Sequence, residues 1–205
     1  VLFKIPTTET FIIQESLSMK KALEEAILLS KYKIPVLITG ETGTGKGLFA
    51  GAIHYSGENN LKKDFVRVDC GAINSNLALS ELFGHVKGAF TGADKDKIGF
   101  FKLVENGTIF LDEIGNQDEI FQRNLLSVVE TGEFRLVGKA NGVPEKTNLR
   151  IIAATNINLE EAMDKGKFRK DLFYRLEKGY INLTPLRDRK EEIPLFLDSP
   201  LGLTP

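Results

Sequence analysis

The feature that most constrains this chain is a glycine-rich loop between two regular segments. Residues 40–46 read Gly-Glu-Thr-Gly-Thr-Gly-Lys and match the first seven positions of the phosphate-binding pattern G-x-x-x-x-G-K-[ST]. A short apolar run at 36–39 precedes the loop, and a helix is predicted over about 46–54. Because this pattern needs a buried strand before it and a helix after it, we predict an α/β nucleotide-binding fold.

The glycines of this loop allow backbone N–H groups to turn inward around phosphate oxygens, and the helix N-terminus adds favourable partial charge. The alternative is an ordinary strand-to-helix turn with a surface lysine. Position 47 is Gly rather than Ser or Thr, so the hydroxyl that usually holds Mg²⁺ is absent, and the helix loses about 1 kcal/mol relative to Ala. The predicted nucleotide-binding residues are Gly40, Glu41, Thr42, Gly43, Thr44, Gly45, Lys46 and Gly47.

Polar side chains follow two further apolar runs, 108–111 and 149–154. Ligands of open parallel sheets bind at the carboxyl ends of strands. Asp112 is therefore suited to the Mg²⁺ shell and Glu113 to polarising an attacking water as general base. Asn156 could orient that water or sense the γ-phosphate. The alternatives are two exposed acids that cap the next turn, and an Asn that forms a turn.

The remaining segments alternate between strand-like and helix-like patterns, which indicates a parallel sheet covered on both faces. A helix is predicted after Ser18 up to Ser30, and another over 118–130 with apolar spacing that includes Ile120. Two segments interrupt the alternation: the glycine-rich stretch 84–99, and 134–146, a predicted hairpin around Asn141-Gly142. Further expected elements are strands at 65–68 and 180–183 and a helix at 74–83.

Composition excludes several classes of protein. Hydrophobic residues make up 42% of the chain, which supports a buried core, and the net charge of −1 gives no global basic excess for nucleic-acid binding. Cys70 is the single cysteine, so an internal disulfide is impossible, and two histidines give no zinc cluster. A reducing, cytoplasmic location is expected, because the sequence shows neither a signal peptide nor an apolar run near 18 residues.

Several ordered motifs carry a family resemblance over roughly residues 11–196. The chain resembles the central AAA+ ATPase domain of bacterial sigma-54-dependent transcription activators, the enhancer-binding proteins. The motifs are Gly-Glu-Thr-Gly-Thr-Gly-Lys (40–46), Ser-Glu-Leu-Phe-Gly-His (80–85), Gly-Ala-Phe-Thr-Gly-Ala (88–93), Gly-Thr-Ile-Phe-Leu-Asp-Glu-Ile (107–114), Arg-Ile-Ile-Ala-Ala-Thr-Asn (150–156), Phe-Arg-Lys-Asp-Leu-Phe-Tyr-Arg-Leu (168–176) and Pro-Leu-Arg-Asp-Arg (185–189).

The resemblance implies a three-layer α/β fold with a central parallel sheet, the AAA+ P-loop NTPase fold. Residues 1–10 would be a linker remnant, 11–196 the sigma-54 interaction subdomain, and 197–205 a truncated tail. The helical lid that follows in the family is largely absent. We therefore expect a piece of a longer protein that binds nucleotide weakly and hydrolyses little by itself.

The implied function is ATP- and Mg²⁺-dependent remodelling of sigma-54 RNA polymerase holoenzyme to activate transcription. In the family a loop tipped by residues 88–93 contacts sigma-54, and Phe90 and Thr91 would make the key contacts. The alternative is an ordinary glycine-rich hairpin. The predicted partner-binding residues are Gly88, Ala89, Phe90, Thr91, Gly92 and Ala93.

The family also implies a homo-oligomeric ring, usually a hexamer, with ATP at the subunit interfaces. Arg169 and Arg175 match its candidate arginine fingers, which stabilise transition-state charge in the neighbouring subunit. The alternative is surface ion pairs with Asp171 or Glu177. No direct DNA binding or membrane contact is indicated.

A second function remains open, a nucleotide-dependent regulatory scaffold that hydrolyses ATP slowly. Gly47 and Asp69 favour it, because the family usually has Glu and Asn at these positions. A metabolic kinase is disfavoured, since it explains neither the hexapeptide nor the paired arginines.

Asp69 generates a prediction. The family's Asn at this position is thought to pair with the catalytic Glu and switch its orientation, whereas Asp69 and Glu113 would repel. We expect Asp69→Asn to change the ATPase rate and its nucleotide dependence, measured as phosphate release. An unchanged rate and dependence would contradict the perturbed switch.

Overall fold

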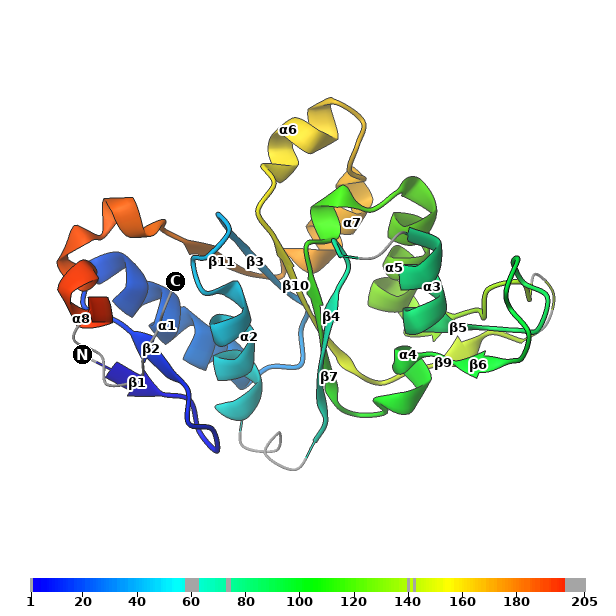
Figure 1. The fold of residues 1–205 in the computed structure, drawn as a ribbon, viewed down its shortest axis with the longest axis horizontal. Coiled ribbons are helices and arrows are strands. Elements are labelled where there is room, and N and C mark those ends of the chain that lie inside the picture. Colours follow the sequence, from blue (N-terminus) through cyan, green and yellow to red (C-terminus); the bar gives the residue numbers. More distant parts are fainter. Residues whose placement is uncertain (1, 58–62, 73–74, 140, 142, 198–205) are drawn as a thin grey trace.

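In a computed structural model of the protein, the described residues are 2–57, 63–72, 75–139, 141 and 143–197. A five-stranded parallel sheet lies between two groups of helices, as predicted (Figure 1). Its strand order is β11-β3-β10-β7-β4. The strands are β3 (Val36–Gly40), β4 (Phe65–Asp69), β7 (Thr108–Asp112), β10 (Arg150–Thr155) and β11 (Gly179–Leu183).

Burial along the strands explains their place in the sheet. Every residue of β7 and of β10 is buried, as expected for central parallel strands covered on both faces. The edge strand β11 instead alternates buried and exposed residues, so that Tyr180 is exposed. The apolar runs of the sequence thus became the inner strands.

Alternate residues of the central strands divide the core into two halves. Ile109 and Leu111 pack with α3, α5 and α7, whereas Phe110 and Ile152 pack with α1 and α2 on the other face. Figure 1 shows these two groups of helices on either side of the sheet. The helices are α1 (Leu17–Ser30), α2 (Lys46–Tyr55), α3 (Ser75–Phe83), α4 (Phe100–Leu103), α5 (Glu119–Thr131), α6 (Leu159–Asp164), α7 (Lys170–Leu176) and α8 (Ile193–Leu197), with 3-10 turns at Ile114–Asn116, Leu186–Asp188 and Lys190–Glu192.

Two helix predictions need correction. The first helix begins at Leu17 rather than after Ser18, and Ser16 caps it, because the Ser16 hydroxyl accepts the N–H of Met19 at 3.3 Å. In α5 the buried face is shifted by one residue: Phe121 is fully buried, whereas Ile120 is 57% exposed. The predicted helix 74–83 is observed as α3, and Asn74 lies outside the described residues.

The two interrupting segments are short antiparallel pairs that lie together at one end of the molecule (Figure 1). The first pair is β5 (Gly84–His85) with β6 (Lys97–Ile98), and the second is β8 (Glu133–Phe134) with β9 (Glu145–Lys146). The predicted hairpin is confirmed at its base, and Gly142 of its turn lies outside the described residues.

A third pair was not predicted. Strands β1 (Leu2–Lys4) and β2 (Phe11–Ile13) form an antiparallel ribbon beside α1 and α2. None of the described helices combines the length and apolarity that crossing a bilayer requires.

Phe49 tests the two-sided core. Its side chain is fully buried between α2 and the sheet. We expect Phe49→Ala to lower the free energy of unfolding by about 3–5 kcal/mol, because it leaves a cavity. Urea denaturation measures the change, and Leu103→Ala, at a 58% exposed position, is the control with a loss below about 0.5 kcal/mol.

Candidate nucleotide-binding site

The phosphate-binding loop joins the end of β3 to the start of α2, as the sequence predicts. Gly43 and Gly45 adopt φ values of 82° and 99°, which residues other than Gly rarely adopt. The buried Lys46 ammonium donates to the carbonyl oxygens of Gly40 at 2.9 Å and Glu41 at 3.2 Å. Carbonyl groups of the loop thus fix the position of Lys46, the first residue of α2.

The acidic pair ends the neighbouring strand β7. Asp112 is buried, and Glu113 follows it in a left-handed conformation with φ 56°. This conformation is uncommon outside Gly, and such strain concentrates at functional positions. Lys46 Nζ lies 3.6 Å from Glu113 Oε1, so the loop and the acidic strand end face each other.

Asn156 connects the same two segments. Its backbone N–H donates to Glu113 Oε2 at 3.2 Å, and its side-chain Nδ2 donates to Thr42 Oγ1 at 3.1 Å. Three segments that are far apart in the sequence therefore meet at the carboxyl edge of the sheet. The contacts place Asn156 beside both segments, and its role toward water or the γ-phosphate stays a prediction.

The carboxylate of Asp69 points into its own turn. Its Oδ1 accepts the N–H groups of Gly71 at 3.0 Å and Ala72 at 3.1 Å, whereas the Glu113 oxygens face Asn156 and Lys46. The turn still lies close to the candidate base, because a Cβ added at Gly71 would be 3.0 Å from Glu113 Cβ. The effect of Asp69 on Glu113 stays a prediction.

Arg169 and Arg175 form ion pairs with carboxylates of α5 and α7. Arg169 pairs with Asp171 at 2.7 Å and with Glu119 of α5 at 3.4 Å. Arg175 pairs with Glu130 of α5 at 2.8 Å, rather than with Glu177. The ion-pair alternative is therefore observed within one chain, and a role toward a neighbouring subunit is not tested by it.

An apolar cavity of about 270 Å³ adjoins the phosphate loop and was not predicted. The ribbon strand β2 supplies Phe11, Ile12 and Ile13, and α2 supplies Leu48. Its walls suit a flat aromatic base beside a phosphate site. No periodic pattern in the sequence places this ribbon beside the loop, so the sequence carried no signal for it.

A buried network around Arg189 was also missed. Arg189 pairs with the fully buried Glu192, which accepts the N–H and hydroxyl of Ser16 at 2.9 and 2.8 Å. Arg189 also donates to the carbonyl oxygens of Thr184 and, at 3.4 Å, of the loop residue Thr44. Because both charges are paired and hydrogen-bonded, their burial is tolerated.

Arg187, two residues earlier, makes a bidentate contact with Glu41 of the loop, with both oxygens at 2.6 Å. These hydrogen bonds hold the pKa of Glu41 below its usual range. The Pro-Leu-Arg-Asp-Arg segment therefore contacts the phosphate loop twice, through Arg187 at Glu41 and through Arg189 at Thr44.

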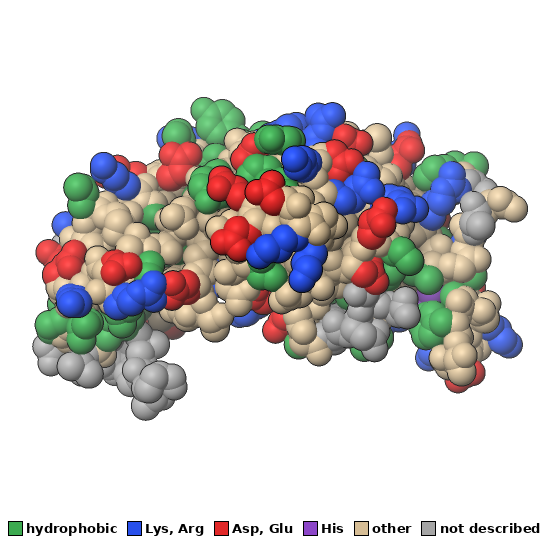
Figure 2. Space-filling view, turned by 90° about the horizontal axis from the view of Figure 1, so that it is seen from above, with side chains coloured by type: hydrophobic (Ala, Val, Ile, Leu, Met, Phe, Trp, Pro, Cys, Tyr) green, Lys and Arg blue, Asp and Glu red, His purple; other side chains and the backbone are tan. Residues whose placement is uncertain are grey.

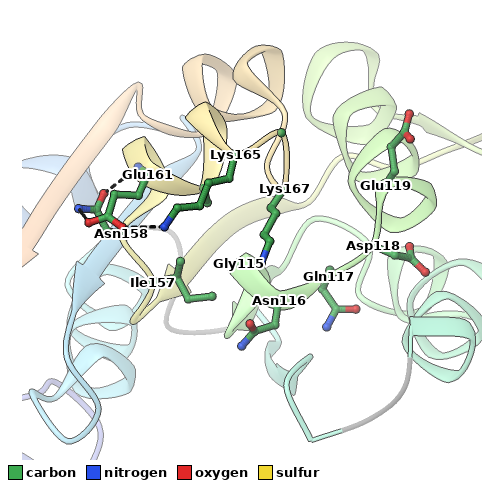
Figure 3. A pocket seen from close by; sticks show the side chains of 12 residues that line it. Gly115, Asn116, Gln117, Asp118, Glu119, Ile157, Asn158, Glu161, Lys165 and Lys167 are labelled. Carbon is green, nitrogen blue, oxygen red and sulfur yellow. Dashed lines mark hydrogen bonds and ion pairs between the residues drawn. The ribbon is translucent and has the colours of Figure 1, made fainter.

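A second cavity, of about 580 Å³, lies between the start of α5 and α6 (Figure 3). In Figure 3 Lys165 extends toward Glu161, with which it forms an ion pair at 3.1 Å. Gln117 points away from α6, and its Nε2 donates to the carbonyl oxygen of Cys70 at 2.7 Å. This contact ties the end of β4 to the turn after Glu113.

The buried thiol of Cys70 sits at that strand end, and burial raises its pKa to about 12. A protonated, enclosed thiol is a poor nucleophile. Cys70 is therefore a core residue and not part of the reactive site.

A phosphate loop, a neighbouring acidic strand end and a polar residue on the strand between them define a P-loop NTPase domain of the AAA+ type. The Sigma-54 interaction domain model matches residues 12–182, so the chain belongs to this family.

Known proteins agree with this assignment. The chain is 44% identical over 194 residues to the Nif-specific regulatory protein of Azotobacter vinelandii, which covers 95% of this chain and 37% of that protein. It is 47% identical over 184 residues to the Nif-specific regulatory protein of Azospirillum brasilense, covering 89% and 29%. The chain thus spans less than half the length of these relatives.

Solved structures share the fold. NtrX from Brucella abortus in complex with ATP superposes with a TM-score of 0.81 at 30% identity, covering 91% of this chain and 39% of that one. The P-loop NTPase domain of the sigma-54 transport activator from E. coli gives 0.54 at 20% identity, covering 85% and 99%.

Lys46 tests the nucleotide site. Excess ADP with Mg²⁺ should raise the melting temperature of the wild type by roughly 5–10 °C, because a ligand at 100 times its Kd adds about 2.7 kcal/mol. Lys46→Ala should abolish this shift, measured by differential scanning fluorimetry. The control is Lys165→Ala, at an exposed lysine, and loss of the shift in both variants would contradict a specific role for Lys46.

Proposed function

We propose that this chain is an ATP-hydrolysing domain that remodels sigma-54 RNA polymerase through the loop that carries residues 88–93. The observation that carries the proposal is the convergence of Lys46, Glu113 and Asn156 at one edge of the sheet. The hexapeptide lies on a separate hairpin at the end of the molecule beyond α3 (Figure 1). The nucleotide site and the loop that would contact sigma-54 thus lie on different elements of one domain.

The residues have distinct roles in hydrolysis. Backbone N–H groups of the loop and the Lys46 ammonium bind the phosphates, and Asn156 orients the attacking water. Glu113 accepts the proton of that water. The left-handed backbone of Glu113 and its hydrogen bond from Asn156 orient its carboxylate for this step. The contact between Lys46 and Glu113 means that a phosphate which draws the ammonium away also frees the base.

Asp112 would hold Mg²⁺. A single buried carboxylate at a strand end fits this ion, which takes one or two carboxylates together with phosphate oxygens and waters. Bound Mg²⁺ would neutralise the phosphate charge.

The loop of residues 88–93 is folded into a tight turn. The N–H of Gly88 donates to the carbonyl oxygen of Ala93 at 2.8 Å, and the N–H of Ala93 donates to Phe90 at 3.0 Å. Phe90 is 37% exposed and packs edge-on against His85 with ring centroids 5.0 Å apart. A partly exposed aromatic ring at a glycine-bounded tip suits an apolar protein contact.

The second hairpin supports this turn. Val137 N–H donates to the Gly84 carbonyl oxygen at 2.9 Å, and Val86 N–H donates to the Val137 carbonyl oxygen at 3.1 Å. A Cβ added at Gly138 would lie 2.6 Å from Ala89 Cβ, so the two segments are in close contact. We infer that they move together when nucleotide is hydrolysed.

We also propose a homo-oligomeric ring in which Arg169 and Arg175 serve the neighbouring subunit. Their side chains are 33% and 51% exposed, so each can exchange its present carboxylate for a phosphate. Figure 2 shows Lys and Arg side chains interleaved with Asp and Glu on the face that carries α6, a mixture that suits charge pairing between subunits.

A nucleotide-dependent scaffold with slow hydrolysis is the second candidate. Gly47, which offers no side chain to the metal, and Asp69 beside the candidate base favour it. Steady-state phosphate release from a protein that includes the lid separates the two functions.

Substitutions of Phe90 and Glu113 in the full-length protein test whether sigma-54 binding and ATP hydrolysis depend on different residues. Phe90→Ala should weaken capture of sigma-54 by at least about tenfold and keep the ATPase rate within about twofold. Glu113→Gln should lower the ATPase rate by about 10²–10⁴-fold and retain ATP-dependent sigma-54 capture.

Pull-down with purified sigma-54 and phosphate release measure the two activities. Loss of both activities in Phe90→Ala, with the fold intact by circular dichroism, would argue against a separate output loop.

A further inference from the structure

The carboxylate that would hold Mg²⁺ already carries a cationic partner from its own chain. Arg67 Nη2 donates to Asp112 Oδ2 at 2.7 Å, from the neighbouring edge strand β4. Arg67 lies in register with Phe110, and its guanidinium carbon lies 5.7 Å from the centre of that ring. The side chain is 59% exposed, whereas that of Asp112 is 10% exposed, so the cation can leave and the carboxylate cannot.

Gly47 lies beside this cation. A Cβ added at Gly47 would lie 3.4 Å from Arg67 Nη1 and 3.7 Å from the Phe110 ring. In the phosphate-loop pattern, position 47 supplies the hydroxyl that meets Mg²⁺. The guanidinium therefore reaches into the space between the two positions that hold the metal in such sites.

We propose that Arg67 is a resident cation that competes with Mg²⁺ for Asp112. This inference rests on the proposed nucleotide site. A guanidinium and Mg²⁺ both bind carboxylate oxygen, and they cannot share the same oxygen at close range without repelling each other. Metal entry thus requires Arg67 to leave, which raises the Mg²⁺ concentration that the site needs.

The other charges around Arg67 agree with this competition. Glu113 faces Lys46 and Asn156, and the Asp69 oxygen accepts the N–H groups of its own turn. Asp112 is thus the carboxylate that Arg67 contacts among the described residues. At low Mg²⁺ concentration Arg67 stays on Asp112, and as the Mg²⁺ concentration rises the metal replaces it.

The direct test is a Mg²⁺ titration of the chain with the fluorescent nucleotide mant-ADP. Arg67→Ala should lower the half-saturating Mg²⁺ concentration about fivefold, the factor that an ion pair with one exposed partner can supply. Arg67→Lys, which keeps a cation, should stay nearer the wild type. Gly47→Glu should resemble Arg67→Ala, because the new carboxylate attracts the guanidinium away from Asp112.

A second measurement needs no nucleotide. Mn²⁺ binding, followed by electron paramagnetic resonance, should tighten in Arg67→Ala by a similar factor. In an Asp112→Asn background the same substitution should have no effect. Arg123→Ala, which removes an exposed arginine paired with Glu119, is the matched control and should change neither measurement.

The outcomes separate this inference from the proposed function. An unchanged Mg²⁺ and Mn²⁺ response in Arg67→Ala overturns the competition, and a higher Mg²⁺ requirement makes Arg67 a phosphate ligand instead. Failure of mant-ADP to bind at any Mg²⁺ concentration overturns the nucleotide site, and the Mn²⁺ titration still decides whether Arg67 competes.

Discussion

The parallel register of β3, β10 and β7 is the constraint on which the rest of the site depends. Thr155 of β10 pairs with Thr39 of β3, and Ala153 of β10 pairs with Leu111 of β7, so these strands end at the same edge. The carboxyl end of each strand then supplies one component: the phosphate loop after β3, Asn156 after β10, and the acidic pair at the end of β7. Because side chains alternate along a strand, a slip of one residue would send Asp112 to the opposite face and dismantle the site.

Charge at this edge is arranged in local pairs. Lys46 faces Glu113, Arg187 binds Glu41, and Arg67 binds Asp112. Each acid thus meets a cation that a nucleotide phosphate can also attract. Binding would exchange partners rather than bring together uncompensated charges, so the site can accommodate several negative groups within a small volume.

Much of this arrangement was predictable, because it follows from local patterns. The apolar runs before Gly40, Asp112 and Asn156 predicted the inner strands, and parallel strands imply a shared edge. The ribbon β1–β2 and the Arg67 contact were not predictable, since they depend on pairing between distant segments with no periodic signal. The buried face of α5 shows the same limit: Phe121 is buried and Ile120 is exposed, because the packing of α5 against α3, α7 and β8 decides which face is covered.

The buried Arg189–Glu192 pair has a mechanical consequence. It clamps the start of α1, through Ser16, to the segment after β11 and to the carbonyl of Thr44 in the phosphate loop. Two stretches of chain 176 residues apart thus share one rigid anchor against the loop. A force on either stretch would therefore reach the phosphate loop through the same ion pair between Arg189 and Glu192.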